Sequence, residues 1–298
     1  MLHFPVLLEE SVEFLIHKKN GHYIDCTYGR GGHTSLILDS ILPEGFLTSF
    51  DKDPEAFDHG LLKNDKNFKI INESFCKLDS YFSDETVDGI IFDLGTCSTH
   101  FDDKERGFSF RQEGPLDMRF NTLKGIPLST WINSAEESEI RDILYKFGDE
   151  KHAKIIARSI ANLRKDKPIE TTIQLANIIE DIYPKRKNKK IHPATKSFQA
   201  FRIFINNELD ELKESLEMAS KVIKKNGVIV VISFHSLEDN IVKNFFKPDI
   251  KSFPKDIPLN SIEDKKFKCI AKKIRPTQEE VDKNKRSRSA IMRVFKKL

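Results

Sequence analysis

A glycine-rich turn between a predicted strand and a predicted helix constrains the fold of this chain more than any other feature. The strand is residues 22–26, the turn reads Gly29-Arg-Gly-Gly-His33, and the helix covers 34–42. Glycines there let main-chain N–H groups approach a ligand at the N-terminus of the helix. The spacing is not Gly-x-Gly-x-x-Gly, so the turn favours an adenosine-type cofactor such as S-adenosylmethionine over a dinucleotide.

Strands and helices alternate through the first ninety residues. A helix is predicted over 6–16, and further strands over 46–50, 69–72 and 87–94. Pro54 is predicted to begin another helix, because a missing N–H costs little in the first turn. Such alternation predicts right-handed βαβ units and a parallel sheet.

Three predicted strands of this sheet have an aspartate at or next to their carboxyl end, namely Asp25, Asp51 and Asp93. Ligands of open α/β sheets bind at the carboxyl ends of the strands, so the three carboxylates should converge there. Asp51 lies twenty residues beyond Gly31, where a carboxylate can accept hydrogen bonds from ribose hydroxyls. Any one of them could equally cap a helix, but three together favour a ligand site. Phe75 follows the weak strand and could stack on an adenine or belong to the core.

The alternation stops after Gly95. Residues 96–126 show little periodicity, and loops of that length inside a domain are usually functional. The sequence then reads as helical throughout, with helices predicted over 134–147, 150–164 and 171–182.

The βα pattern resumes with one long helix, whose apolar face runs from Phe198 to Ala219 and which Asn226-Gly227 closes. A buried strand over 228–234 follows, and a late strand over 289–295 is predicted to lie antiparallel at the edge. We therefore predict an α/β fold with a doubly wound sheet. Residues 1–125 and 196–298 would form the sheet domain, and 126–195 an inserted, all-helical domain.

The net charge of +3 conceals an asymmetry. Residues 247–298 contain 16 basic and 7 acidic side chains, a net +9, so the remaining 246 residues carry −6. A second basic block runs from Lys185 to Lys190. Such clusters attract a phosphate backbone without regard to its sequence. Either block alone could be a solvated surface, but the two together favour a nucleic-acid partner.

The sequence shows no membrane-spanning run, no targeting peptide and no paired cysteines, and these features bear on the compartment and on metal binding. The longest apolar run, Val228 to Phe234, is too short to span a bilayer, and Glu9 and Glu13 interrupt the N-terminal apolar residues, unlike a signal or transit peptide. The four cysteines form no Cys-x-x-Cys pair, which argues against a zinc ribbon and a disulfide scaffold. We expect a cytoplasmic protein with no membrane partner and no metal site. The oligomeric state is left open, a homodimer included.

Two further motifs remain ambiguous. Ser236 and Asp239 after the last buried strand predict a capping box, and His235 beside them could be a general base or structural. Arginine and phenylalanine alternate over Arg106–Phe110. They could stack on splayed bases or anchor the loop to the core.

Ten segments in order resemble one family over almost the whole chain. They are residues 3–9, 29–33, 51–54, 93–95, 105–110, 114–119, 192–195, 198–203, 233–239 and 286–290. Among them are Glu105-Arg-Gly-Phe-Ser-Phe110, Gly114-Pro-Leu-Asp-Met-Arg119 and Ser233-Phe-His-Ser-Leu-Glu-Asp239. The chain resembles the bacterial S-adenosylmethionine-dependent methyltransferases that modify N4 of a cytidine in the decoding region of 16S ribosomal RNA.

The resemblance implies a class I, Rossmann-like methyltransferase with an inserted substrate-recognition domain. It implies S-adenosylmethionine as cofactor and the small ribosomal subunit as partner. The family usually continues Asp-Leu-Gly with Val-Ser-Ser-Pro-Gln, whereas this chain has Thr96-Cys-Ser-Thr-His100, so His100 replaces a glutamine that touches the cofactor. Carried over by position, the other cofactor contacts fall on Gly31, Gly32, His33, Asp51, Phe75 and Asp93.

The expected reaction is in-line transfer of the sulfonium methyl group to an exocyclic amine. Asp93 is our candidate for accepting a hydrogen bond from that amine, which must be presented by an unpaired or flipped base. The alternatives are a methyltransferase acting on another nucleic-acid base and a non-catalytic RNA-binding protein. The latter would not need the strand-end aspartates. A nicotinamide-dependent oxidoreductase is disfavoured by the turn, and the Asn/Asp-Pro-Pro-Tyr/Phe motif of DNA amino-methyltransferases is absent from the sequence.

Overall fold

The computed structural model describes residues 4–63, 65–184, 192–247 and 266–298. The chain divides into two compact units, which we call the sheet unit (1–95 and 209–298) and the helical unit (96–208). The basic block from Lys185 to Lys190 lies outside the described residues, as does the part of the C-terminal basic segment at 248–265. No helix within the described ranges is long and apolar enough to cross a membrane.

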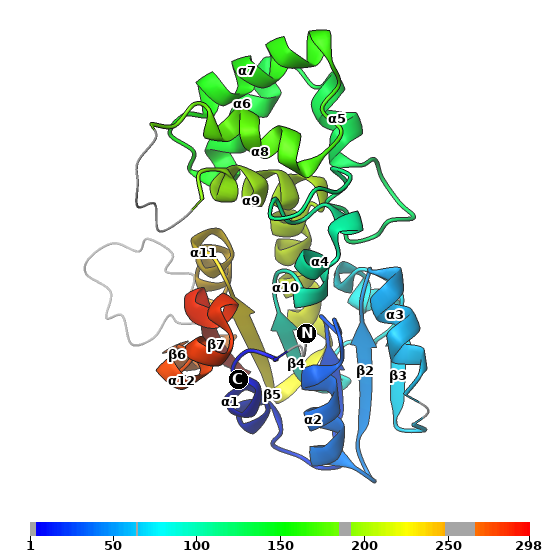
Figure 1. Cartoon of the computed structure of the whole chain (residues 1–298). Coiled ribbons are helices and arrows are strands. Elements are labelled where there is room, and N and C mark those ends of the chain that lie inside the picture. The colour runs from blue at the N-terminus through cyan, green and yellow to red at the C-terminus, as the bar shows by residue number, and fades with distance from the viewer. Residues whose placement is uncertain (1–3, 64, 185–191, 248–265) are drawn as a thin grey trace, which may run out of the picture. The chain divides into compact units, whose positions relative to one another are not determined.

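The sheet unit is built on one seven-stranded sheet (Figure 1). The strand order is β3-β2-β1-β4-β5-β7-β6. The first five strands in this order are parallel, whereas β7 is antiparallel to both of its neighbours. The strands are β1 (His22–Asp25), β2 (Phe46–Phe50), β3 (Phe68–Ile71), β4 (Val87–Asp93), β5 (Ile223–Ser233), β6 (Phe267–Ile274) and β7 (Ile291–Lys297). The predicted α/β fold is confirmed.

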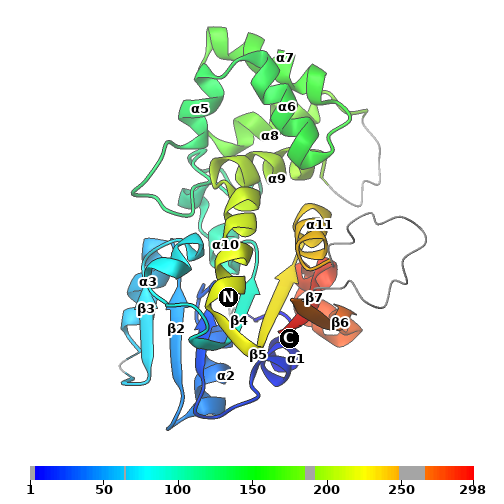
Figure 2. The same ribbon diagram turned by 180° about the vertical axis from the view of Figure 1, so that it is seen from behind.

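Helices cover both faces of this sheet, as the two opposite views show (Figures 1 and 2). Helices α1 (Leu8–Leu15) and α2 (Gly32–Ile41) pack on the face that carries Tyr23, Ile91 and Val230. Helices α10 (Glu208–Val222) and α11 (Ser236–Phe245) pack on the other, with Ile24, Ile90 and Val231. Because successive strand residues point to opposite faces, a sheet covered on both sides needs the continuous apolar runs seen here. The doubly wound arrangement is thereby confirmed.

The shorter elements of the sheet unit surround this sheet. Helix α3 (Pro54–Leu61) begins at Pro54 as predicted, and the Asp53 side chain caps it by accepting the Glu55 N–H. The remaining elements are η1 (Phe75–Ser80), α12 (Gln278–Lys283) and η4 (Lys285–Ser289).

The helical unit has its own core, separate from those of the sheet. The predicted limits of the inserted domain, 126 and 195, differ from the limits of this unit. Leu116 and Met118 from the preceding loop and Phe198 and Phe201 from α9 are buried in the same core as the other helices. The elements of the unit are α4 (Ser98–Asp102), η2 (Lys104–Arg106), α5 (Leu128–Ser134), α6 (Glu137–Gly148), α7 (Ala153–Asp166), α8 (Thr172–Glu180) and α9 (Ala194–Ile205).

The prediction of a single long helix over 198–226 is wrong, because the structure has two helices there, α9 and α10. The break falls at Asn206, whose side chain binds main-chain groups of Met118 and Phe120, and at Asn207, whose φ is 51°. Helix α10 also ends at Val222 rather than at Asn226. Apolar periodicity continues across the break, so the pattern alone could not reveal it.

The late strand is antiparallel as predicted but does not lie at the edge. The lysine-rich strand β6, which the sequence analysis missed, pairs with the outer side of β7. Three of its four exposed residues are lysines, as is common for edge strands, and the apolar signal is therefore weak.

Candidate cofactor and catalytic site

The glycine-rich turn joins β1 to α2 and has the backbone that glycine permits. Gly31 has φ 74° and precedes the first residue of α2. A Cβ atom on Gly31 would lie 2.8 Å from the Tyr28 hydroxyl, and one on Gly32 would lie 2.1 Å from Cγ of Pro5. Side chains are therefore disfavoured at both positions. The Gly31 N–H donates to the Tyr28 carbonyl oxygen at 2.7 Å, so a cofactor would meet the helix start at Gly32 and His33.

Asp51 is hydrogen-bonded to this turn. It follows β2, which pairs directly with β1, and its Oδ2 accepts the Gly29 N–H at 2.8 Å. The other oxygen, Oδ1, accepts the Asp53 N–H at 2.9 Å. An ionised carboxylate offers about four lone-pair sites, so Asp51 can still accept ribose hydroxyls while it holds the turn.

Asp93 ends β4, the neighbour of β1 on its other side. Its main-chain N–H donates to Thr27 Oγ1 at 2.7 Å, which ties β4 to the turn. The Asp93 side chain is 17% exposed, and Oδ2 lies 3.6 Å from Nδ1 of His33. Asp51 and Asp93 therefore flank the glycine turn at the carboxyl edge of the sheet, as predicted.

The imidazole of His33 is buried rather than open to a ligand. Its Nε2 lies 3.2 Å from the Val6 carbonyl oxygen, and its Nδ1 faces Asp93. The ring thus lies beside the Asp93 carboxylate, and any cofactor contact by His33 would come from its main chain at the helix start.

Asp25 does not join the other two aspartates as a ligand-facing group. It is 1% exposed, Oδ2 accepts the Thr34 hydroxyl at 2.7 Å, and Oδ1 accepts the Thr27 N–H at 3.0 Å. The Thr34 hydroxyl also lies 2.8 Å from that of Ser49. Burial raises the pKa of Asp25 to about 6. The expectation that Asp25 faces the ligand is thus wrong, since both of its oxygens are used beneath the turn.

Thr27 and Thr34 are site residues that the sequence analysis missed. Both hydroxyls link strand ends to the turn, one through Asp93 and one through Asp25. In the sequence, these two hydroxyl residues follow the strand-end Asp25 by two and nine positions. Helix and turn propensities do not distinguish them from other residues of the turn.

Phe75 begins the 3₁₀ turn η1 after β3. Its ring packs edge-on against Phe92 at 5.7 Å, with an interplanar angle of 88°, and the side chain is only partly buried. Phe75 therefore serves the core, and stacking of its remaining surface on an adenine stays a prediction.

These residues fit the chemistry of S-adenosylmethionine. The turn brings the start of α2 next to Asp51, which can accept hydroxyls, and Asp93 is a carboxylate at the neighbouring strand end. A helix start flanked by two carboxylates matches an adenosine carrying a charged amino-acid tail.

His100 lies in the helical unit, within an aromatic cluster. Its ring stacks on Phe108 at 5.0 Å and tilts against Phe120 at 5.2 Å, and it is 7% exposed. Arg106 donates from Nη2 to the main-chain oxygen of Phe120 at 2.9 Å. Arg106 and Phe108 therefore anchor the loop, which decides between the two predicted roles for them. A cofactor contact by His100 stays a prediction.

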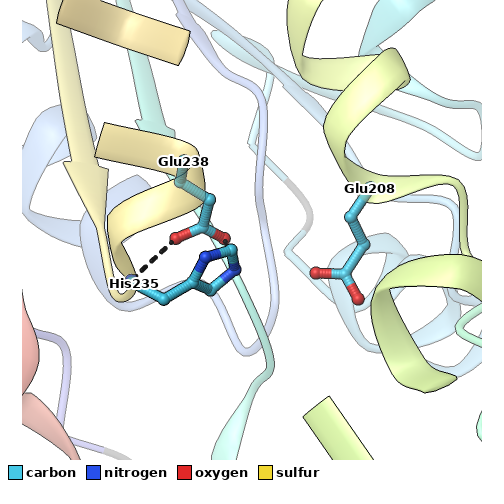
Figure 3. Close-up of side chains that lie close together, drawn as sticks. All are labelled: Glu208, His235 and Glu238. Carbon is cyan, nitrogen blue, oxygen red and sulfur yellow. Dashed lines mark hydrogen bonds and ion pairs between the residues drawn. The ribbon is translucent and has the colours of Figure 1, made fainter. Parts of the chain in front are cut away.

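The predicted capping box at Ser236 and Asp239 is wrong by one residue. His235 precedes α11, and Glu238 Oε2 accepts the N–H groups of Phe234 at 2.7 Å and His235 at 3.2 Å. Figure 3 shows these two side chains, with Glu238 Oε1 3.1 Å from Nε2 of His235. Asp239 instead binds Arg293 through both oxygens. Glu208, also drawn there, belongs to the helical unit, where Arg202 binds its carboxylate.

Comparison with known proteins bears directly on this arrangement. A model of the MraW methylase family matches residues 1–298. A protein of Marinomonas sp. (strain MWYL1) named ribosomal RNA small subunit methyltransferase H is 45% identical over 305 residues, which cover 99% of this chain and 97% of that protein. The protein of the same name from Buchnera aphidicola subsp. Cinara cedri is 45% identical over 309 residues and covers both chains completely.

A solved S-adenosylmethionine-dependent methyltransferase from Aquifex aeolicus aligns over 99% of this chain and 91% of its own, with 9% identity and a TM-score of 0.44. Similarity at that level adds nothing to the assignment, which depends on the family match along the whole chain. That match confirms the resemblance seen in the motifs, the Rossmann-like methyltransferase fold and S-adenosylmethionine as cofactor. The chain belongs to the MraW methylase family.

Proposed function

We propose that this protein transfers a methyl group from S-adenosylmethionine to the exocyclic N4 of a cytidine in the decoding region of 16S ribosomal RNA. Its substrate is the small ribosomal subunit in the cytoplasm. Relatives named ribosomal RNA small subunit methyltransferase H, at 43–45% identity over essentially the whole chain, support this substrate.

The observation that carries the proposal is the placement of Asp51 and Asp93 on either side of the glycine turn. Strands β2, β1 and β4 are adjacent and parallel, so their carboxyl ends form one edge. An edge with a helix start and two carboxylates suits a cofactor that has hydroxyls and an ammonium group. A protein that only bound RNA would not need it.

Gly31, Gly32 and the main chain of His33 would hold the cofactor at the helix start, and Asp51 would accept its ribose hydroxyls. Bound S-adenosylmethionine supplies a methyl group on a sulfonium centre. The cytosine amine is a poor nucleophile because its lone pair is delocalised into the ring. Asp93, which lies beside His33, would accept a hydrogen bond from that amine and align it for attack.

The helical unit, and with it the inserted residues 126–195, would present the RNA. Its loop at 106–120 is held by main-chain contacts from Arg106 and Asn206, so its backbone is fixed within the unit before RNA binds. The cytidine must be unpaired or flipped out of its stack to reach any such site.

The test is methyl transfer from tritiated S-adenosylmethionine to small subunits purified from cells that lack this gene, followed by nucleoside analysis. The expected label is in N4-methylcytidine. Label in another nucleoside would favour a methyltransferase of different base specificity. Measurable cofactor binding without label on subunits or naked RNA would contradict the proposed substrate, and no cofactor binding would contradict the enzyme itself.

A further inference from the structure

The edge strand β6 carries a concentration of positive charge that the proposed catalytic site does not use. Residues 266–275 contain five cationic and no acidic side chains. All five are exposed, and none of them forms an ion pair with an acidic side chain in the described part of the chain. We call them the β6 strip: Lys266, Lys268, Lys272, Lys273 and Arg275.

The backbone of β6 is shaped so that these charges face outward. Its register against β7 shifts between Cys269 and Ala271 and again between Ala271 and Ile274. Bulges of this kind interrupt the alternation of a strand and redirect side chains. Lys272 and Lys273 are therefore both exposed although they are consecutive, whereas in a regular strand one of them would point to the opposite face.

The second bulge is held from the side of β7. Arg293 donates from Nη1 to the Lys272 carbonyl oxygen, and its other nitrogens bind Asp239 at 2.6 and 2.9 Å. Both side chains of this pair are about one-eighth exposed, at 12% and 13%. A largely buried, two-point ion pair thus fixes the Lys272 carbonyl between the outward-facing lysines.

Lysines on an edge strand also prevent sheets from pairing with one another. This strip, however, has five charges over ten residues, which at strand spacing extend over about 30 Å. Other exposed lysines of the sheet unit do pair with an acid, among them Lys213, Lys283 and Lys285 at 2.7–3.0 Å. The five charges of the β6 strip are therefore available to a partner outside the molecule.

We propose that the β6 strip is a phosphate-binding surface for the RNA substrate, contacting its backbone rather than its bases. This inference rests on the proposed function for the identity of the RNA. Ammonium groups on flexible stems suit point contacts to phosphates and carry no base specificity. The strip would contribute affinity and orientation, while the cofactor site supplies the chemistry.

The test compares two triple variants of the full-length protein with the same loss of charge. One is Lys268→Gln, Lys272→Gln and Lys273→Gln. The matched control is Lys213→Gln, Lys283→Gln and Lys285→Gln, at the paired lysines. Binding to protein-free 16S ribosomal RNA is measured between 50 and 300 mM KCl, about the range over which phosphate contacts are lost. Methylation of small subunits and affinity for S-adenosylmethionine are measured in parallel.

For the strip variant, the slope of log Kobs against log salt should fall by about two, at roughly 0.7 per phosphate contact. Its KM for subunits should rise about tenfold or more, with kcat and cofactor affinity unchanged. The control should keep the wild-type slope. Equal slope losses in both variants, or in neither, would overturn the inference. So would aggregation of the strip variant at an unchanged slope, or weaker binding to subunits but not to RNA. If the slope falls only in the strip variant while the wild-type protein methylates no RNA, the result would support the phosphate-binding strip and contradict the proposed function.

Discussion

Three aspartates at neighbouring strand ends have different surroundings, and the surroundings decide what each can do. Asp25 is enclosed by hydroxyls and a main-chain N–H, Asp51 is bound to two main-chain N–H groups, and Asp93 is partly exposed beside His33. Asp51 and Asp93 are therefore accessible to a ligand, whereas Asp25 is enclosed. The three have the same residue type and lie within one residue of their strand ends.

Asp93→Asn should separate catalysis from cofactor binding. If Asp93 accepts a hydrogen bond from the target amine, the neutral amide loses most of that interaction, and kcat should fall about 100-fold or more. The dissociation constant for S-adenosylmethionine should change far less. Single-turnover methylation with saturating cofactor measures the first, and calorimetric titration the second. Near-normal turnover would exclude the acceptor role, and Asp79→Asn, at an exposed carboxylate of the same unit, serves as control.

Asp25→Asn should change how stability depends on pH. Burial raises the pKa of Asp25 from 3.8 to about 6 in the folded chain. Between pH 4 and 6 the unfolded chain releases this proton while the folded chain keeps it, so the native state loses stability as the pH rises. The asparagine variant lacks this loss. Its free energy of unfolding relative to wild type should therefore rise by up to about 3 kcal/mol from pH 4 to pH 7.

Urea unfolding at pH 4, 5, 6 and 7 measures this difference. Parallel curves for the two proteins would show that Asp25 ionises at its ordinary pKa in the folded state.

At the scale of elements, side chains that bind main-chain groups hold the loop between α4 and α5. Asn206 accepts the Phe120 N–H and donates to the Met118 carbonyl oxygen, both at 2.7 Å. Met118 has φ 64° and is fully buried, so this loop has a strained but well-enclosed backbone. The same asparagine ends α9, which couples the break between the helices to the loop.

Asn206→Ala should therefore destabilise the helical unit by about 2–4 kcal/mol, because it leaves buried main-chain groups without partners. Trp131, the one tryptophan in the sequence, packs against Phe204 at 4.6 Å, so its fluorescence reports on the unfolding of this unit. Asn162→Ala, at an exposed position of α7, should change stability by less than about 0.5 kcal/mol. Equal stability of the two variants would contradict the role given to Asn206.

For the whole molecule, the main consequence is that two units have separate cores. The residues predicted to hold the cofactor, His100 excepted, all lie in the sheet unit, whereas Trp131 and α5–α9 lie in the helical unit. Ligand binding stabilises the part that binds it, by about 2.7 kcal/mol at 100 times the dissociation constant.

S-adenosylmethionine should thus slow amide hydrogen exchange in peptides that cover 25–34, 51–53 and 93–95. Peptides from α6 and α7 should exchange as before, and the Trp131 unfolding transition should stay in place. Uniform protection across both units would show instead that they open as one cooperative body.

The local elements and the family were determined by the sequence itself. Strand patterns ending in Asp51 and Asp93, the glycine turn and Pro54 are local signals, since each depends on backbone geometry within a few residues. What only the tertiary structure decided depends on partners far apart in the chain. Asn206 binds Met118 88 positions away, and Arg293 binds Asp239 54 positions away. Asp25 is withdrawn from the site by its burial in the packed sheet and by its bond with Thr34. Apolar periodicity reports which face is buried but not which polar side chain finds which partner, so the helix break, the edge strand and the role of Asp25 became visible only in the folded chain.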